Sequence, residues 1–257
     1  MIDRSSGNGV GRADRAVDRL YADMRRVYGG RHAGANGYRS RRFFRREQAV
    51  VLDALAGSGD LPEGAVLDIA CGSGLMLGDP PGGQALARAV VGVDFNARAC
   101  LDARANGLSI VRGDAFALPF PAESFAQAIN CQFFNQQTGD ARAPFLAEAA
   151  RCLKPGGRLV LMWRKADSLL HRSAHAALRP LDRLRGLPDF PQHLHRIDQI
   201  AAAAEAHDLQ VRRAGVTLPF ARGRARPPVV DPDALVGRIL GASNLLVLEK
   251  RAPGERP

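Results

Sequence analysis

The chain lacks the features that mark membrane, secreted and metal-binding proteins. It has four cysteines among 257 residues, and no two of them form a Cys-x-x-Cys pair. This spacing favours free thiols over disulfides or a metal site. No apolar run approaches the roughly 18–20 residues of a membrane-spanning helix, and the polar N-terminus has no apolar signal segment. We therefore expect a cytoplasmic protein with no membrane partner.

Acidic residues are also in short supply. There are 26 of them against 36 lysines and arginines, which gives a formal net charge of +10. Such an excess can indicate a nucleic-acid partner. The basic residues are dispersed, however, with the densest groups at residues 39–46 and 222–226, and no motif interleaves them with aromatic residues for base stacking. We expect a small-molecule partner, and nucleic acid stays open as the alternative.

The composition, 46% hydrophobic and 24% charged, is that of one compact globular domain. Residues 1–12 have little apolar content, which predicts disorder. Apolar spacing then predicts helices over residues 14–28 and 40–56. We expect residues 1–60 to form this tail and a helical lid. Residues 61–257 would form the main domain, with an insertion at 165–197 and a monomeric or homodimeric state.

From residue 65 onward, strand-like apolar segments alternate with amphipathic ones. This alternation predicts an α/β fold with a doubly wound, mostly parallel seven-stranded sheet and helices on both faces. The expected strands lie near residues 65–70, 90–94, 109–112, 126–131, 158–163, 210–218 and 244–250. The expected helices of this part cover residues 97–106, 141–153, 168–184 and 198–207.

The most informative stretch is Val-Leu-Asp-Ile-Ala-Cys-Gly-Ser-Gly at residues 66–74, which reads as a buried strand entering a glycine turn. A second apolar segment ends at Asp94. In nucleotide-binding doubly wound sheets, an acid in this place accepts hydrogen bonds from ribose hydroxyls. A dinucleotide site needs a third glycine, and Leu77 stands there instead. This substitution disfavours an NAD-linked oxidoreductase.

The glycine turn resembles motif I of the class I S-adenosylmethionine (SAM) dependent methyltransferases. Two later runs strengthen the resemblance. Residues 114–126 match the family's D-A-x-x-L-P-F-x-x-x-S-F-D run, with Ala126 in place of the last Asp, and residues 151–159 match R-x-L-K-P-G-G-x-L. The resemblance covers residues 60–165 and is closest to the type 11, small-molecule branch.

The resemblance implies a Rossmann-like fold, closed by one antiparallel strand and covered by an N-terminal helical lid. It also implies an enzyme that binds SAM and transfers its methyl group to a small or medium organic acceptor by direct displacement. The alternatives that stay open are an RNA or protein methyltransferase and a weakly active relative of the fold.

The resemblance further assigns residues to the methionine part of SAM. Asp68 would hold its amino end, and the backbone of Ala70, Gly72 and Gly74 would line it. Asn130, at the end of the fourth predicted strand, would face the same part. The alternative for Asp68 is a solvated acid at a strand end.

The adenosine part is assigned in the same way. Asp94 would accept from both ribose hydroxyls, with Phe95 against the adenine. Asp114 would accept from the adenine amino group, and the Ala115 backbone would contact the ring. The alternatives are a helix cap for Asp94, before the helix that starts near Asn96, and a helix or turn cap for Asp114.

The sequence indicates fewer residues for binding the methyl acceptor. Phe133 or Phe134 would form a wall of the acceptor pocket, and ordinary core packing is the alternative. If the acceptor must lose a proton, the first candidates for a catalytic base are Tyr28, His32 and Tyr38, which lie in the expected lid.

Two histidine pairs have spacings that can bind metal. His171 and His175 are four apart, and His193 and His195 are two apart. No accompanying glutamate or further ligand spacing is present, so we expect exposed histidines and no metal.

A departure from the family pattern follows the glycine turn, where Pro80 and Pro81 interrupt the expected long helix. Proline cannot sit in a helix interior without losing hydrogen bonds. We expect a helix cut to about one turn, kinked, or restarted near residues 84–89.

Overall fold

A computed structural model describes residues 22, 41–57, 61–78, 89–184, 193–219, 228–252 and 254. The expected disordered tail, nearly all of the first predicted helix and all but the last residue of the possible restart at 84–89 lie outside these residues.

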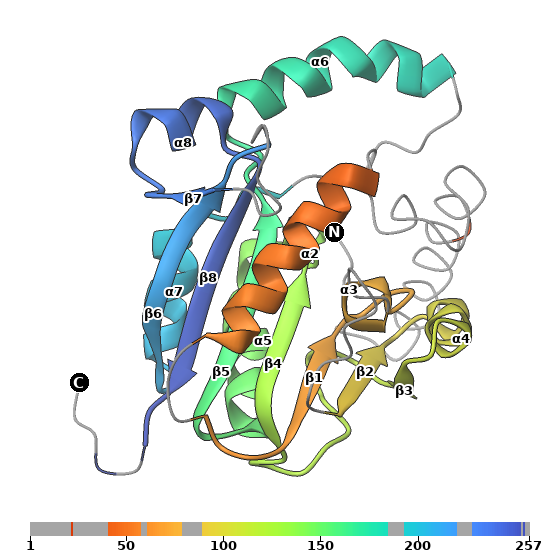
Figure 1. Cartoon of the computed structure of the whole chain (residues 1–257), viewed down its shortest axis with the longest axis vertical. Helices are drawn as coiled ribbons and strands as arrows, with labels where there is room; N and C mark the ends of the chain where they lie inside the picture. Colours follow the sequence, from red (N-terminus) through yellow and green to blue (C-terminus); the bar gives the residue numbers. More distant parts are fainter. Residues whose placement is uncertain are drawn as a thin grey trace.

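One eight-stranded sheet in the order β3-β2-β1-β4-β5-β8-β6-β7 forms the centre of the described part of the protein (Figure 1). The first five strands pair in parallel, and β8 runs antiparallel between β5 and β6. The strands are β1 (Ala65–Ile69), β2 (Val90–Asp94), β3 (Ser109–Arg112), β4 (Phe125–Cys131), β5 (Leu153–Arg164), β6 (Leu209–Thr217), β7 (Val229–Val230) and β8 (Ser243–Lys250).

The predicted fold class is confirmed, with β7 as an addition. This strand has two residues and pairs antiparallel with the end of β6. Two residues carry no measurable periodicity, so the sequence pattern could not reveal it.

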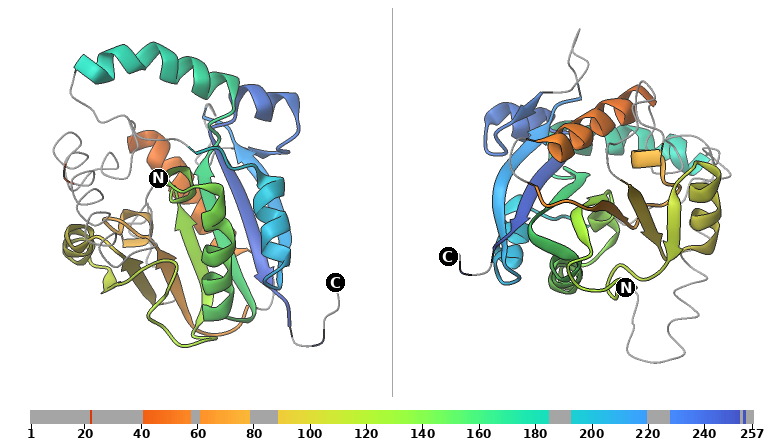
Figure 2. Two further views of the ribbon diagram at one scale, coloured as in Figure 1. Left: turned by 180° about the vertical axis from the view of Figure 1, so that it is seen from behind. Right: turned by 60° about the horizontal axis from the view of Figure 1, so that its bottom comes forward.

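Helices cover both faces of the sheet. In Figure 1, α2 crosses the near face, and Figure 2 shows α5 and α7 on the opposite face. The long helix α6 lies beyond the ends of the strands, next to α8. The helices are α2 (Arg41–Ala56), α3 (Leu75–Gly78), α4 (Ala97–Ala105), α5 (Arg142–Cys152), α6 (Leu169–Leu184), α7 (Ile197–Glu205) and α8 (Leu235–Leu240). None of the described helices is long and apolar enough to cross a bilayer.

The core consists of two layers because strand side chains alternate between the sheet faces. On β5, Leu161 and Trp163 pack in the cluster that contains residues of α5 and α7. Val160 and Met162 pack in the cluster that contains residues of α2 and α3. The strands are therefore apolar on both faces, as expected for a parallel sheet covered by helices on each side.

The parallel strands bring their carboxyl ends to one edge of the sheet, where ligands of doubly wound folds bind. β1 and β4 are neighbours, and the residue after each adopts a left-handed backbone: φ is 55° at Ala70 and 64° at Gln132. Such φ values are costly for residues other than glycine and often occur at functional sites. The chain thus turns sharply away from the sheet at both positions.

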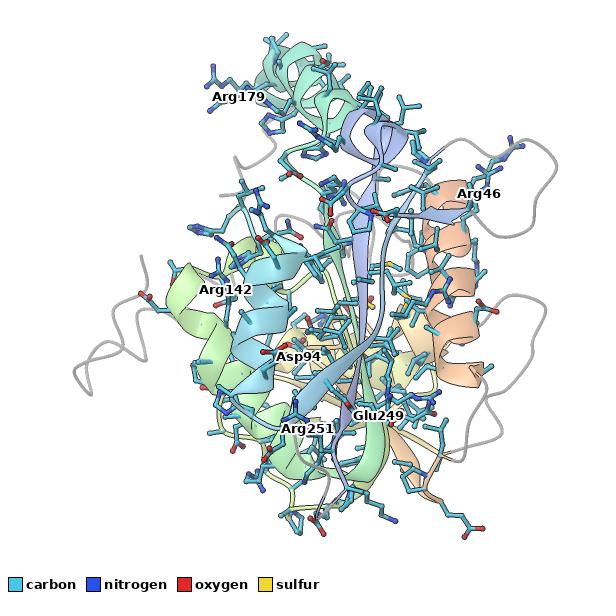
Figure 3. All side chains as sticks on the ribbon, turned by 90° about the vertical axis from the view of Figure 1, so that its left-hand side faces the viewer. Arg46, Asp94, Arg142, Arg179, Glu249 and Arg251 are labelled. Carbon is cyan, nitrogen blue, oxygen red and sulfur yellow. The ribbon has the colours of Figure 1, made fainter. Side chains whose placement is uncertain are left out.

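The expectation of exposed histidines is wrong for His195, which is 2% exposed. Its Nδ1 accepts from Nε of Arg142 at 3.0 Å, and its Nε2 lies 2.9 Å from the Gln137 carbonyl. Arginine can only donate, so the proton belongs on Nε2 and the ring is neutral. The His195 carbonyl also accepts from Nε1 of the buried Trp163 at 2.8 Å. Figure 3 shows Arg142 on α5 beside α7.

Acid should destabilise the protein through His195. Burial and the nearby Arg142 charge lower the pKa of His195, so the unfolded chain binds a proton at a higher pH than the folded protein does. The stabilising contribution is complete above the unfolded pKa of about 6.5 and is lost as the pH falls from there through the folded pKa. Urea unfolding between pH 8 and 5 should show this loss, and His195→Gln, which does not titrate, should show a shallower pH dependence. Equal slopes for the two proteins would contradict the assignment.

Candidate functional site

The turn after β1 is held by the neighbouring strand β2. The Cys71 N–H donates to the Val93 carbonyl at 3.1 Å, and the Gly72 N–H donates to Oδ2 of Asp94 at 2.8 Å. A third bond, from the Gly74 N–H to the Cys71 carbonyl at 2.9 Å, closes the turn on itself. The predicted glycine turn and the predicted acid therefore form one hydrogen-bonded unit.

Glycine is required at the end of this turn. Gly74 has a φ of 72°, and a Cβ atom there would lie 2.9 Å from Cδ2 of Leu108. The turn thus excludes a side chain both by its backbone conformation and by its contact with the residue before β3.

Asp94 accepts two backbone hydrogen bonds and caps no helix. Its Oδ1 accepts from the Asn96 N–H at 2.9 Å, while Oδ2 accepts from Gly72. The N-cap of α4 is Asn96, whose side chain accepts from the Ala99 N–H at 2.8 Å, so the helix-cap interpretation of Asp94 is wrong. Burial raises the pKa of Asp94, and the backbone hydrogen bonds oppose that rise. Each carboxylate oxygen has a second acceptor position with which it could bind a hydroxyl.

Asp68 and Asn130 present buried acceptors at the ends of β1 and β4. Asp68 is 1% exposed and Asn130 is fully buried, so Asp68 is not a solvated acid. Nδ2 of Asn130 donates to the Ile69 carbonyl at 2.8 Å. Among the described residues, Oδ2 of Asp68 and Oδ1 of Asn130 have no hydrogen-bond partner. Burial, and then the charge of Asp94, raise the pKa of Asp68 well above its usual range.

Unpartnered buried acceptors are rare in folded proteins because desolvation is costly. A donor, and for Asp68 above all a cationic donor, would relieve this cost. The ammonium of a methionine moiety is such a group. The unpartnered acceptors at this edge therefore fit the predicted cofactor.

Known proteins resemble this chain in sequence and in fold. Residues 67–161 match the sequence model of a family described as a methyltransferase domain. A demethylmenaquinone methyltransferase of Corynebacterium kroppenstedtii is 36% identical over 100 residues, which cover 39% of this chain and 42% of that protein. Residues 67–161 thus resemble a methyltransferase domain. The chain spans less than half the length of the curated relatives that it matches.

Solved structures confirm the predicted fold. A SAM-dependent methyltransferase of Thermotoga maritima, described as a possible histamine N-methyltransferase, aligns with a TM-score of 0.58 at 21% identity, over 90% of this chain and all of that one. Magnesium protoporphyrin IX methyltransferase of Synechocystis, with bound S-adenosylhomocysteine (SAH), aligns with a TM-score of 0.61 at 17% identity, over 92% and 99%. The predicted fold is thus confirmed, and it is the fold of these methyltransferases.

The adenine contacts expected from the sequence stay predictions. Phe95 is half-buried, and its carbonyl accepts from Nε of Arg112 at 3.0 Å. Oδ1 of Asp114 accepts from the Phe116 N–H at 3.0 Å, which is the turn-capping role left open for this residue. Ala115 is 8% exposed in this turn. These residues lie after β2 and β3, next to the glycine turn.

The two candidate aromatic residues after β4 have different places. Phe134 is fully buried and packs against Phe145 and Trp163, so it belongs to the core. Phe133 is half-buried and lies with its ring 5.6 Å from that of Phe116, which follows the predicted adenine-binding residues. Phe133 alone remains a candidate for a pocket wall.

The candidate bases Tyr28, His32 and Tyr38 lie outside the described residues. Within the described ranges, no group of three or more His, Cys, Asp or Glu side chains could hold a metal. His171 and His175 stack on each other on α6, with ring centroids 6.1 Å apart.

Sequence reasoning missed Glu47 and Gln48 on α2, which are both fully buried. Glu47 lies at the carboxyl edge of the sheet, where it accepts from Oγ1 of Thr217 at 3.3 Å and Nε2 of Gln132 at 3.5 Å. The two residues follow buried Phe44 by three and four positions, so they sit on the core-facing side of the helix. Polar residues at core positions were the available signal.

Replacing Gly74 should damage the turn more than a loss of glycine freedom alone does. Gly74→Ala combines left-handed backbone with overlap against Leu108, whereas Gly107→Ala has a similar φ of 84° and open space. The free energy of unfolding should fall by roughly 1–2 kcal/mol in Gly107→Ala, the cost of a left-handed alanine, and by more in Gly74→Ala. Denaturant titration of the two variants checks this order. An equal loss in both would mean that the turn can move away from Leu108.

Proposed function

We propose that the protein is a SAM-dependent methyltransferase that acts on a small or medium organic acceptor. The observation that carries the proposal is the arrangement of the glycine turn, Asp94 and Asp68 at the carboxyl edge of the sheet. A glycine turn without a third glycine is bonded to Asp94 at the end of β2. An unpartnered carboxylate oxygen of Asp68 lies buried near the end of β1, the strand that leads into this turn. SAM, when bound, supplies a methyl group already activated on a sulfonium.

Different residues of this site would contact different parts of the cofactor. Asp68 and Asn130 would accept from the ammonium of its methionine part. The two oxygens of Asp94 would each accept from one ribose hydroxyl while keeping their bonds to the backbone. Gly72 and Gly74 let the backbone approach closely because neither carries a side chain.

Direct displacement requires mainly that acceptor, methyl group and leaving sulfur are held in line. The carboxyl ends of β4 and β6, with Glu47 from α2, provide polar groups for holding an acceptor. A proton must be removed only from some acceptors, and Tyr28, His32 and Tyr38 remain the candidates for this.

A small acceptor is favoured over nucleic acid. The proteins named as similar above include methyltransferases of demethylmenaquinone and magnesium protoporphyrin IX, which are small organic molecules. The exposed arginines of α6 are the described feature that could suit an anionic acceptor, and Arg179 among them points away from the body of the molecule (Figure 3). A solvated face explains that arrangement equally well. A cytoplasmic location and a monomeric or homodimeric state complete the proposal.

Asp94→Ala should remove most of the stabilisation that the cofactor gives. A ligand that binds only the folded protein raises the unfolding midpoint, and this variant loses both ribose contacts. Thermal unfolding should therefore shift with SAM or SAH in the unmodified protein and in the surface control Asp140→Ala, but hardly in Asp94→Ala. NAD should shift none of them. An unaltered shift in Asp94→Ala would show that the ribose contact is misassigned.

Asp68→Asn should distinguish the two ends of the cofactor. A hydrogen bond to a charged group contributes about 1.5–3 kcal/mol, so the Kd for SAH should rise roughly 10- to 100-fold. The Kd for 5′-methylthioadenosine, which has no amino-acid part, should stay constant, whereas Asp94→Ala should weaken both ligands. Calorimetry with the two ligands makes the comparison. Equal weakening of both ligands by Asp68→Asn would place Asp68 away from the ammonium.

A further inference from the structure

Gln48 on α2 donates to the helix that follows the glycine turn. Its Nε2 lies 2.9 Å from the carbonyl oxygen of Leu75 and 2.8 Å from that of Met76. Its Oε1 accepts from NH1 of Arg45 at 2.9 Å, which fixes the orientation of the amide. Gln48 is fully buried, and Leu75 and Met76 are 6% and 4% exposed.

The two carbonyls need this donor because α3 is very short. It contains four residues and ends at Gly78. In a longer helix the Met76 carbonyl would accept from the N–H of residue 80, but residue 80 is proline and has no N–H. The carbonyls at a helix end have no partner within the helix, and burying an unpaired one costs about 1–3 kcal/mol. The side-chain amide of glutamine has two N–H donors, so one residue can bond both oxygens.

Together with two other hydrogen bonds, these bonds hold the turn at successive positions. Gly72 is bonded to Asp94, the Ser73 carbonyl accepts from Nδ2 of Asn106 at 2.8 Å, and Gln48 then holds the first two residues of α3. The turn is thereby fixed at its beginning, its middle and its end. The last anchor comes from α2 rather than from the sheet.

We propose that Gln48 is a positioning residue that bonds the carbonyls of Leu75 and Met76, the second of which loses its helical donor at Pro80, and that it thereby holds the glycine turn in its cofactor-binding shape. This inference rests on the proposed function and extends it. Gln48 acts through the turn and touches neither methyl donor nor acceptor. Its loss should weaken binding of the donor while leaving the turnover rate at saturating donor unchanged.

The test compares two substitutions of Gln48 with a matched control. Gln48→Met keeps the volume but removes both donors, and Gln48→Glu turns acceptor oxygens toward the two carbonyls. The control is Gln127→Met, because Gln127 is also buried and donates to a helix carbonyl, that of Leu55, at 2.7 Å, away from the turn. All three variants lose stability, but only those at Gln48 should affect the turn.

We expect the Kd for SAH to rise about tenfold in Gln48→Met, as one to two lost hydrogen bonds imply, and further in Gln48→Glu. KM for SAM should rise with it while kcat stays constant, and Gln127→Met should change neither constant. Replacing Pro80 and Pro81 by alanine within Gln48→Met restores N–H groups after α3 and should recover part of the affinity. Equal weakening in Gln48→Met and Gln127→Met, or weakening in neither, overturns the proposal.

A second readout separates this proposal from the proposed function. Amide hydrogen exchange of residues 72–76 without any ligand should accelerate in Gln48→Met and stay unchanged in Gln127→Met. If the unmodified protein binds neither SAM nor SAH, the proposed function fails, and the exchange rates alone then decide the role of Gln48. Unchanged exchange in Gln48→Met overturns that role. If Gln48→Met does not fold, Gln48→Asn, which keeps the donors on a shorter side chain, takes its place in both measurements.

Discussion

The hydrogen bond from the Gly72 N–H to the Asp94 carboxylate links the two elements on which the site depends. It joins the turn after β1 to the end of β2 at 2.8 Å. Parallel pairing of β1 with β2 brings these ends together in register, with Ile69 opposite Val93. The sheet thereby sets both the position of the acid and the shape of the turn. The bond also orients the carboxylate, because each of its oxygens accepts from a different backbone N–H.

This arrangement has a cost that the rest of the fold must offset. The buried Asp68 lies close enough to the partly buried Asp94 for the charge of Asp94 to raise the pKa of Asp68. Asp68 and Asn130 each keep an acceptor without a described partner, and left-handed backbone at Ala70 and Gln132 adds strain. Strain and desolvation at one edge of a sheet are typical of a site prepared for a ligand. The fully buried residues of β5 and β8 on both faces of the sheet supply the hydrophobic stabilisation that permits it.

The sequence allowed most of the fold to be predicted because strands and helices with apolar periodicity are local signals. The motif acids Asp68 and Asp94 could be found for the same reason, since each ends an apolar strand. The places of other residues depend on tertiary contacts, which the local sequence does not reveal. Phe134 and its neighbour Phe133 are equivalent in sequence, and both contact Phe145 of α5. Only the full burial of Phe134, which also packs against Trp163, places it in the core. His195 was predicted to be exposed, but it is buried and bonded to both Arg142 and Trp163.

The sequence was least informative about the polar residues of α2, because their roles depend on contacts with distant parts of the chain. Glu47 and Gln48 are adjacent in sequence, yet one contacts the end of β6 and the other the carbonyls after the glycine turn. Arg46, beside them, donates from NH1 to the Pro219 carbonyl at 3.1 Å, near the end of β6 (Figure 3). A single helix therefore bonds both to the end of β6 and to the residues after the glycine turn. α2 thus acts as a structural link between these two parts of the carboxyl edge.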